Sequence, residues 1–218
     1  MFRKKLDMKS MASGDELTIN IPGNVENLAL PDPALLQYYI DQENRVVWLE
    51  GDVDESCVEI VKQIMKWNAD DKGIERDARK PIRLCIFSNG GALDVNNALV
   101  DIIKLSETPV YGINIGVAAS AACFIFMSCH KRYALKSAYF LLHQGGAENI
   151  GGTFAQVVAA VEDYQNKIEK LYNYILENST ISEEMLEERI YGEWYMSAEE
   201  AVQYGICDKI VTSIEEIL

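Results

Sequence analysis

Short apolar runs alternate with amphipathic stretches through the first two thirds of the chain. The apolar runs are rich in Val, Ile, Leu, Phe and Tyr, which predicts buried strands. These strands are expected at residues 45–49, 82–87, 110–115 and 139–142. Between the first three runs, apolar positions recur at three- and four-residue steps, which predicts helices over 58–67 and 95–105. Alternation at this spacing implies right-handed βαβ crossovers, so we expect an α/β domain with a mainly parallel sheet.

A longer helical pattern follows the glycine pair at 151–152. Apolar residues recur at three- and four-residue steps from Phe154 to Leu176, over about 25 residues. A stripe of this length suits either a partner helix or the domain's own sheet, and the periodicity alone favours neither. Near the end of the chain, Ser197 and Glu200 form a capping box that predicts a helix over 198–204, and a last strand is expected at 206–211.

The two ends of this pattern define the expected domain. Residues 1–44 contain turn signals at 21–23 and 30–33 with little helical periodicity, so they are interpreted as an irregular or strand-bearing N-terminal arm. The segment 68–80 is charged and poor in apolar residues, which predicts an exposed loop. We therefore expect one compact domain over residues 45–218.

Composition narrows the classes of function. The 218 residues carry a net charge of −14, which disfavours nucleic acid as a partner, and no apolar run is long enough to span a membrane. The five cysteines are scattered without CxxC spacing, and only two histidines accompany them. This pattern argues for reduced thiols in the cytoplasm and against a metal site. Cys85 and Cys123 lie in apolar stretches and are expected in the core.

Three strand ends carry residues suited to catalysis. A hydroxyl becomes a nucleophile beside a base, usually histidine. His130 lies in a polar turn and is expected on the surface, whereas His143 ends an apolar strand and precedes glycines. The other two strand ends carry the segments 88–91 and 116–120. Because ligands bind beyond the carboxyl ends of strands in open α/β sheets, these segments and His143 are expected to meet.

Ser120 is the candidate nucleophile of this group. It follows a strand at the expected start of a helix, where free amides favour developing negative charge. The amides of Gly90 and Ala121 are candidates for holding the oxyanion. A serine among alanines is ordinarily a packing residue, and the glycine pair with the single well-placed histidine changes that interpretation. We expect the Ser120 hydroxyl within about 3.5 Å of a His143 ring nitrogen.

Four motifs in register resemble the proteolytic subunit of the Clp protease, in the crotonase-like superfamily. These motifs are Ile86–Gly91, Gly116–Ala122, Leu142–Gln144 and Met196–Asp208. Their order and spacing agree with the family from about residue 45 to the end of the chain. The resemblance implies a crotonase-like (ClpP) fold, repeated βαβ units and a protruding handle helix within about 145–180.

The resemblance also implies roles for individual residues. Ser120 would be the nucleophile and His143 the general base and then acid, with the amides of Gly90 and Ala121 as the oxyanion hole. Three further residues would bind the substrate backbone as an added strand, namely Gly91, Ala92 and Gly145. The family's aspartate in the triad aligns with Glu193, whose extra methylene must be accommodated. Asp208 is interpreted as a structural cap.

An assembly and a function follow from the resemblance. The handle would interlock two heptameric rings as a tetradecamer, enclosing a chamber in which unfolded polypeptides are cut. An AAA+ unfoldase would feed the chamber and use ATP, so that no cofactor is expected in this chain. Three site residues depart from the family's pattern, since Asn89 and Gly145 replace prolines and Ala121 replaces a methionine. The first 44 residues match the family poorly, and in the family this segment helps to dock the unfoldase. The unfoldase is therefore a weaker implication of the resemblance than the peptidase chemistry.

Three alternative functions are also compatible with the sequence. The chain could be an ATP-independent processing protease, such as a viral head-maturation protease of this fold. It could instead be a ring subunit without catalytic activity, an interpretation that Glu193 supports and that Ser120 with His143 opposes. A crotonase-type acyl-CoA enzyme shares the oxyanion chemistry, but the serine and histidine pair fits peptide hydrolysis better. Substrate preference, ring composition, the identity of the unfoldase and N-terminal processing do not follow from the sequence.

Overall fold

A computed structural model describes residues 33–146 and 150–217. The chain divides into two compact units, residues 1–37 and 38–218, and the architecture described below is that of the second unit. The turn signals expected at 21–23 and 30–33 fall mostly or wholly among residues 1–32, outside the described residues. Residues 33–44 were predicted to belong to an irregular or strand-bearing arm, but they form helix α1 (Pro33–Asn44). Proline is well suited to the first turn of a helix, because its missing N–H has no partner there.

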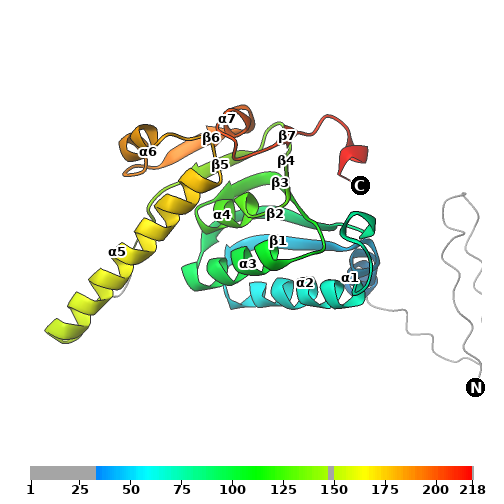
Figure 1. The fold of residues 1–218 in the computed structure, drawn as a ribbon, viewed down its shortest axis with the longest axis horizontal. Coiled ribbons are helices and arrows are strands. Elements are labelled where there is room, and N and C mark those ends of the chain that lie inside the picture. The colour runs from blue at the N-terminus through cyan, green and yellow to red at the C-terminus, as the bar shows by residue number, and fades with distance from the viewer. Residues whose placement is uncertain (1–32, 147–149, 218) are drawn as a thin grey trace, which may run out of the picture. The chain divides into compact units, whose positions relative to one another are not determined.

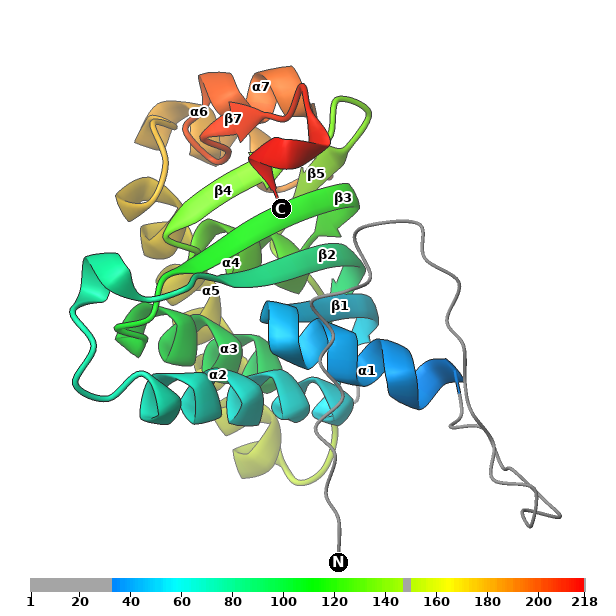
Figure 2. The same cartoon turned by 90° about the vertical axis from the view of Figure 1, so that its right-hand side faces the viewer.

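The described strands form one mainly parallel sheet. The strands are β1 (Val46–Val53), β2 (Ile82–Gly91), β3 (Val110–Ala119), β4 (Lys131–Ala134), β5 (Tyr139–Leu142), β6 (Trp194–Ser197) and β7 (Lys209–Ile210). They pair in the order β1-β2-β3-β4-β7, while β5 pairs with the far end of β3 and with β6. Figure 2 shows β1 to β4 side by side in this order. Since only the β5–β6 pair is antiparallel, the predicted fold class is confirmed.

Helices cover the sheet and complete the core. They are α2 (Val58–Asp70), α3 (Leu93–Leu105), α4 (Ala121–Met127), α5 (Phe154–Glu177), α6 (Glu183–Arg189) and α7 (Ala198–Gln203). Helix α4 packs on β2 and β3, and α3 contacts both α4 and α2. Ile64 and Ile103 on these helices are fully buried with Leu84 of β2. The apolar positions at three- and four-residue steps therefore face the sheet, as the sequence predicted.

Helix α5 is the predicted handle. It begins with a capping box in which Thr153 and Gln156 satisfy each other's backbone amides. Figure 1 shows the helix, in yellow, extending beyond the sheet. Its end near the sheet is anchored by Ile175, which is 1% exposed, whereas Phe154 at the other end is 86% exposed. No helix among the described residues is long and apolar enough to cross a lipid bilayer.

A buried ion pair joins the start of β1 to the end of α2. Arg45 donates two hydrogen bonds to Asp71, both at 2.6 Å, and Asp71 also accepts one from Thr108 at 2.8 Å. The prediction of an exposed loop at 68–80 is therefore wrong at its start, where α2 continues to Asp70 and Asp71 is 2% exposed. A charged residue was taken as solvated because its partner lies 26 positions away in the sequence.

The sequence pattern predicted the shortest elements poorly. Strands β4 and β6 have four residues each, and β7 has two where a strand over 206–211 was expected. Helix α6 has seven residues and is capped by Ser182, whose hydroxyl accepts from the Met185 amide. Elements of this length contain too few positions to display a period. The capping box of Ser197 with Glu200, by contrast, is confirmed at the start of α7.

The Asp71 pair predicts a specific loss of stability. We expect Asp71→Asn to lower the free energy of unfolding by about 3 kcal/mol, because it leaves the Arg45 guanidinium without its counter-charge. The hydrogen bonds from Arg45 hold the pKa of the Asp71 carboxyl below its usual value. The stabilisation is therefore fully present above about pH 4 and is lost as the pH falls through the folded-state pKa. Urea unfolding at neutral and acidic pH measures both effects. The exposed neighbour Asp70→Asn is the control, and equal stability of the two variants at neutral pH would contradict the prediction.

Candidate active site

Ser120 occupies a sharp turn between β3 and α4. Its backbone has φ 53° and ψ −124°, a conformation that costs a non-glycine residue about 1–3 kcal/mol. The Ser120 amide donates to the carbonyl of Leu141 at 2.9 Å, which fixes the turn to the end of β5. The flanking Ala119 and Ala121 are buried, while Ser120 itself is partly exposed. The strained turn therefore holds the hydroxyl at the carboxyl edge of the sheet.

His143 reaches the same point from β5. Strand β5 pairs with the end of β3 in the register Ala119 with Leu141, so the residues that follow the two strands are close in space. The Nε2 atom of His143 lies 2.7 Å from Oγ of Ser120. The predicted contact is confirmed. A neutral imidazole accepts the hydroxyl proton through Nε2 when Nδ1 carries its own proton.

The end of β2 brings the glycine pair against Ser120. The β2–β3 register shifts between Ile86 and Ser88, and Gly90 has φ +99°. A Cβ atom at Gly90 would lie 2.7 Å from both the Ala119 carbonyl oxygen and Ser120 Cβ. Only glycine therefore permits this approach of the two strand ends.

The amides of the glycine pair face different ways. Gly90 N donates to Ser88 Oγ at 3.1 Å, so the amide predicted as an oxyanion donor is already engaged within the end of β2. Ala92 N donates to the Val53 carbonyl on β1 at 2.7 Å. Because successive amides along a strand point to opposite edges, the Gly91 amide faces away from β1, toward the side of β3. Gly91 is thus better placed than Gly90 to act beside Ser120.

A cleft of about 670 Å³ opens on this pair, and we call it the Ser120 cleft. Its lining includes Ser120, His143, the predicted backbone-binding residues Gly91, Ala92 and Gly145, and side chains of α5 such as Tyr164 and Lys167. Tyr164 donates to the Gly145 carbonyl at 3.2 Å, so the handle helix supports this edge of the cleft.

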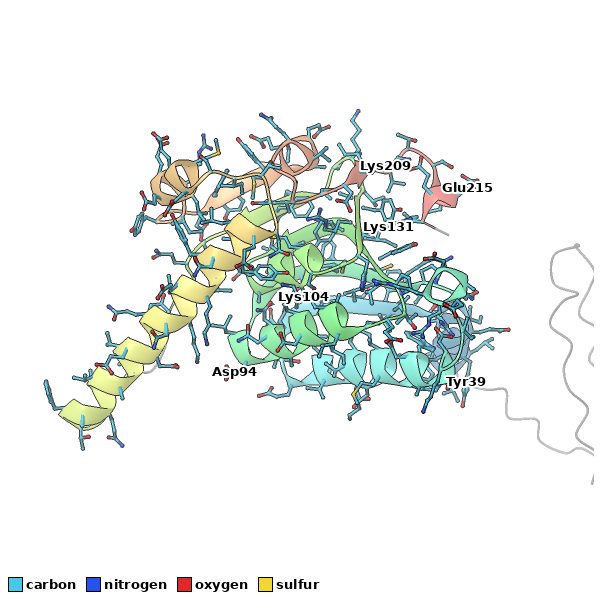
Figure 3. All side chains as sticks on the ribbon, in the orientation of Figure 1. Tyr39, Asp94, Lys104, Lys131, Lys209 and Glu215 are labelled. Atoms are coloured by element: carbon cyan, nitrogen blue, oxygen red, sulfur yellow. The ribbon has the colours of Figure 1, made fainter. Side chains whose placement is uncertain are left out.

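Charged groups on α5 pair with one another along the cleft. Lys167 lies 2.9 Å from Asp163 of the same helix and 3.8 Å from Asp94 of α3. Asp94 is labelled in Figure 3 at the start of α3, below the handle. The two carboxylates raise the pKa of Lys167. The lining of the cleft therefore combines apolar side chains with a lysine that is paired with two carboxylates.

Glu193 makes no hydrogen bond to Ser120 or His143 in the described part of the chain. Strand β6 runs antiparallel to β5 with Leu142 opposite Trp194. His143 follows Leu142, and Glu193 precedes Trp194, so these two residues come next beyond the paired strands. The Glu193 carboxylate accepts a hydrogen bond from the Tyr195 hydroxyl at 2.5 Å, and no hydrogen bond joins it to His143. The expected approach of Glu193 to the imidazole is therefore not seen. Tyr195 was missed, although its position two residues along a strand from Glu193 indicates the same face.

The remaining chemical groups have structural roles. His130, expected on the surface, is partly buried instead, and its Nδ1 accepts from the Val110 amide at 3.0 Å. Burial lowers the pKa of His130, which keeps the imidazole neutral for this contact. Asp208 accepts from both the backbone and the guanidinium of Arg132, in agreement with a structural cap.

The cysteines are poorly suited to act as nucleophiles. All five are free and buried, in agreement with the expectation for Cys85 and Cys123. Burial raises the pKa of Cys85 to about 11 and that of Cys123 to about 12. Since the thiolate is the reactive form, these thiols are inert near neutral pH.

Fold and site together define a serine hydrolase built on a parallel α/β sheet. The hydroxyl and imidazole meet at the carboxyl edge of the sheet and open on a cleft, which is the arrangement required for covalent catalysis by serine. The chain belongs to the Clp protease family, whose model matches residues 37–214, and it is accordingly a serine-type endopeptidase.

Individual relatives agree with this assignment. The chain is 27% identical over 195 residues to the ATP-dependent Clp protease proteolytic subunit 2 of Treponema denticola, covering 88% of this chain and 93% of the relative. It is 30% identical to the ATP-dependent Clp protease proteolytic subunit of Leuconostoc citreum, over 80% of this chain and 86% of the relative. The solved structure of a ClpP1 mutant from Listeria monocytogenes superposes with a TM-score of 0.70 at 22% identity, covering 84% of this chain and 99% of that one, and shows the same fold.

The close approach at Gly90 predicts a large effect of one methyl group. We expect Gly90→Ala to slow acylation of Ser120 by about 100-fold, because the added Cβ must displace the Ser120 turn. The rate of labelling by a fluorophosphonate probe measures this. Gly73→Ala is the matched control, since Gly73 also has positive φ (+90°) but nothing within 4 Å of an added Cβ. Equal labelling of both variants would show that the approach does not matter.

Proposed function

We propose that this endopeptidase cuts unfolded polypeptides with Ser120 as nucleophile and His143 as general base and then acid. The observation that carries the proposal is the 2.7 Å contact between Ser120 Oγ and His143 Nε2 within the cleft. His143 takes the hydroxyl proton as Oγ attacks the scissile carbonyl. It then gives this proton to the leaving amine, which leaves an acyl-enzyme that water hydrolyses by the same steps in reverse.

Two backbone amides are proposed to hold the oxyanion. The Ala121 amide is the first of α4 and so has no acceptor within the helix. The Gly91 amide is proposed as the second donor in place of the Gly90 amide, because the Gly90 amide donates to Ser88. Removing one such donor in other serine hydrolases costs about 100- to 1,000-fold in rate. This chemistry needs no metal or cofactor from the chain.

The substrate is proposed to bind as an added strand along the cleft. Gly91, Ala92 and Gly145 all line this cleft, so main-chain groups are available along the path of a peptide. Recognition through main-chain hydrogen bonds tolerates many side chains, which suits unfolded proteins as substrates. The hydrogen bond from Tyr164 to the Gly145 carbonyl would fix one border of this path.

Ring assembly is proposed from the surface of the handle. Phe154, Val158 and Val161 of α5 are 86%, 38% and 41% exposed. Apolar side chains on a projecting helix are stabilised when a second copy covers them. Relatives bear the name ATP-dependent Clp protease proteolytic subunit, so we infer heptameric rings stacked as a tetradecamer and fed by an AAA+ unfoldase that hydrolyses the ATP. The free thiols suit the cytoplasm.

Loss of the nucleophile should abolish covalent labelling. We expect Ser120→Ala to lose fluorophosphonate labelling completely and to lower peptide hydrolysis by about a millionfold. Ser137→Ala, which changes an exposed serine in a turn, should label like the unmodified protein. Labelling that persists in Ser120→Ala would overturn the proposed nucleophile.

A degradation assay tests the unfoldase. We expect a stably folded substrate to be degraded only when the AAA+ partner and ATP are both present, because a folded chain cannot lie extended along the cleft. Small peptides should be cut without either one. Equal cleavage of folded protein without the ATPase would favour the ATP-independent processing protease instead.

A further inference from the structure

The register of β5 and β6 gives the carboxylate of Glu193 two candidate hydrogen-bond donors. The Tyr195 hydroxyl holds it in the structure at 2.5 Å. The other donor is the ring of His143, which follows Leu142 directly opposite Trp194 in the β5–β6 ladder. Directly opposed residues in such ladders have Cβ atoms about 4.5–5.5 Å apart, a gap that a glutamate side chain spans. Glu193 directly precedes β6 and lies two residues from Tyr195, the spacing at which side chains share one face of a strand.

The ring of His143 has one nitrogen to offer. Its Nε2 faces Ser120, so in the reactive tautomer Nδ1 carries the proton. Within the described residues, the contact with Ser120 is the one hydrogen bond that this ring makes. An acceptor at Nδ1 would fix the ring and stabilise the imidazolium that forms during attack. The β5–β6 ladder ends with Leu142 opposite Trp194, so a continuation of this register would set Glu193 opposite His143.

Tyr195 is suited to hold and to release this carboxylate. Tyr195 is 57% exposed, and the centroid of its ring lies 6.3 Å from that of Tyr139. The hydrogen bond with Glu193 and the carboxylate charge raise the pKa of the Tyr195 phenol. The hydroxyl therefore stays a donor through the neutral range. Because the ring is exposed, it can turn away without disturbing the core.

We propose that Tyr195 is a positioning residue whose hydroxyl holds Glu193 away from His143, so that breaking this hydrogen bond lets Glu193 reach Nδ1 and completes the catalytic triad. The described arrangement is then a resting form in which the serine and histidine are paired but the imidazole has no acceptor. This inference rests on the proposed function of Ser120 and His143. It also explains how glutamate serves at this position, since the longer side chain has two partners within reach.

The test compares Tyr195→Phe with a matched control. Fluorophosphonate labelling of Ser120 should be about tenfold faster in Tyr195→Phe, with kcat for a small peptide raised and KM unchanged, because Glu193 is released. Tyr139→Phe removes the hydroxyl of the neighbouring ring and should leave the rate unchanged. In the Glu193→Gln background, Tyr195→Phe should give no increase, which separates release of the carboxylate from a general loosening of β6. Thermal unfolding confirms that the variants are folded.

Crystal structures provide a readout that does not depend on activity. Tyr195→Phe should place a Glu193 oxygen within about 3.2 Å of His143 Nδ1, a distance absent from the unmodified protein. The inference is overturned if Tyr195→Phe labels no faster than the unmodified protein, or if Glu193 stays away from His143 in the variant. If no protein labels at Ser120, the proposed function fails, and the crystal structures still decide whether Tyr195 holds Glu193.

Discussion

The hydrogen bond from the Ser120 amide to the Leu141 carbonyl is the constraint on which the site depends. It joins the turn after β3 to the end of β5 at 2.9 Å. Leu141 is also the residue that pairs with Ala119, the last residue of β3. This bond offsets part of the strain of a positive φ at Ser120. Because His143 is two residues beyond Leu141, the same bond sets where the imidazole meets the hydroxyl. Nucleophile and base are thus positioned by main-chain pairing before any side-chain contact forms.

Irregular pairing at the strand ends makes room for the chemistry. The β1–β2 register shifts between Glu50 and Asp52, and the β2–β3 register shifts between Ile86 and Ser88. Such shifts bend a strand end and redirect its amides. At the end of β2, beyond the register shift, the Gly90 amide donates to the Ser88 hydroxyl. Regular pairing to the last residue would engage every amide within the sheet.

Sequence reasoning succeeded where a pattern repeats and failed where contacts cross the sheet. The long strands, α2, α3 and the handle were predicted because their apolar periods span many residues, and the pairing of Ser120 with His143 followed from strand ends alone. The four-residue β6 was missed, and with it the register that sets Leu142 opposite Trp194, the residue that follows Glu193. The hydrogen bond from the Gly90 amide to Ser88 was not foreseen, because it depends on the bent end of β2. A linear pattern contains neither the register nor the bend.

The antiparallel β5–β6 pair shows how an added ladder extends the function of a parallel sheet. A parallel strand end can present one catalytic residue, and β5 presents His143. The chain returns along β6 in the opposite direction, so Glu193 arrives at the same end from a distant part of the sequence. Its carboxylate meets Tyr195 first, because residues two apart on a strand are on the same face. The return of the chain along β6 therefore supplies both the carboxylate that is proposed to orient the imidazole and the hydroxyl that holds this carboxylate in the structure.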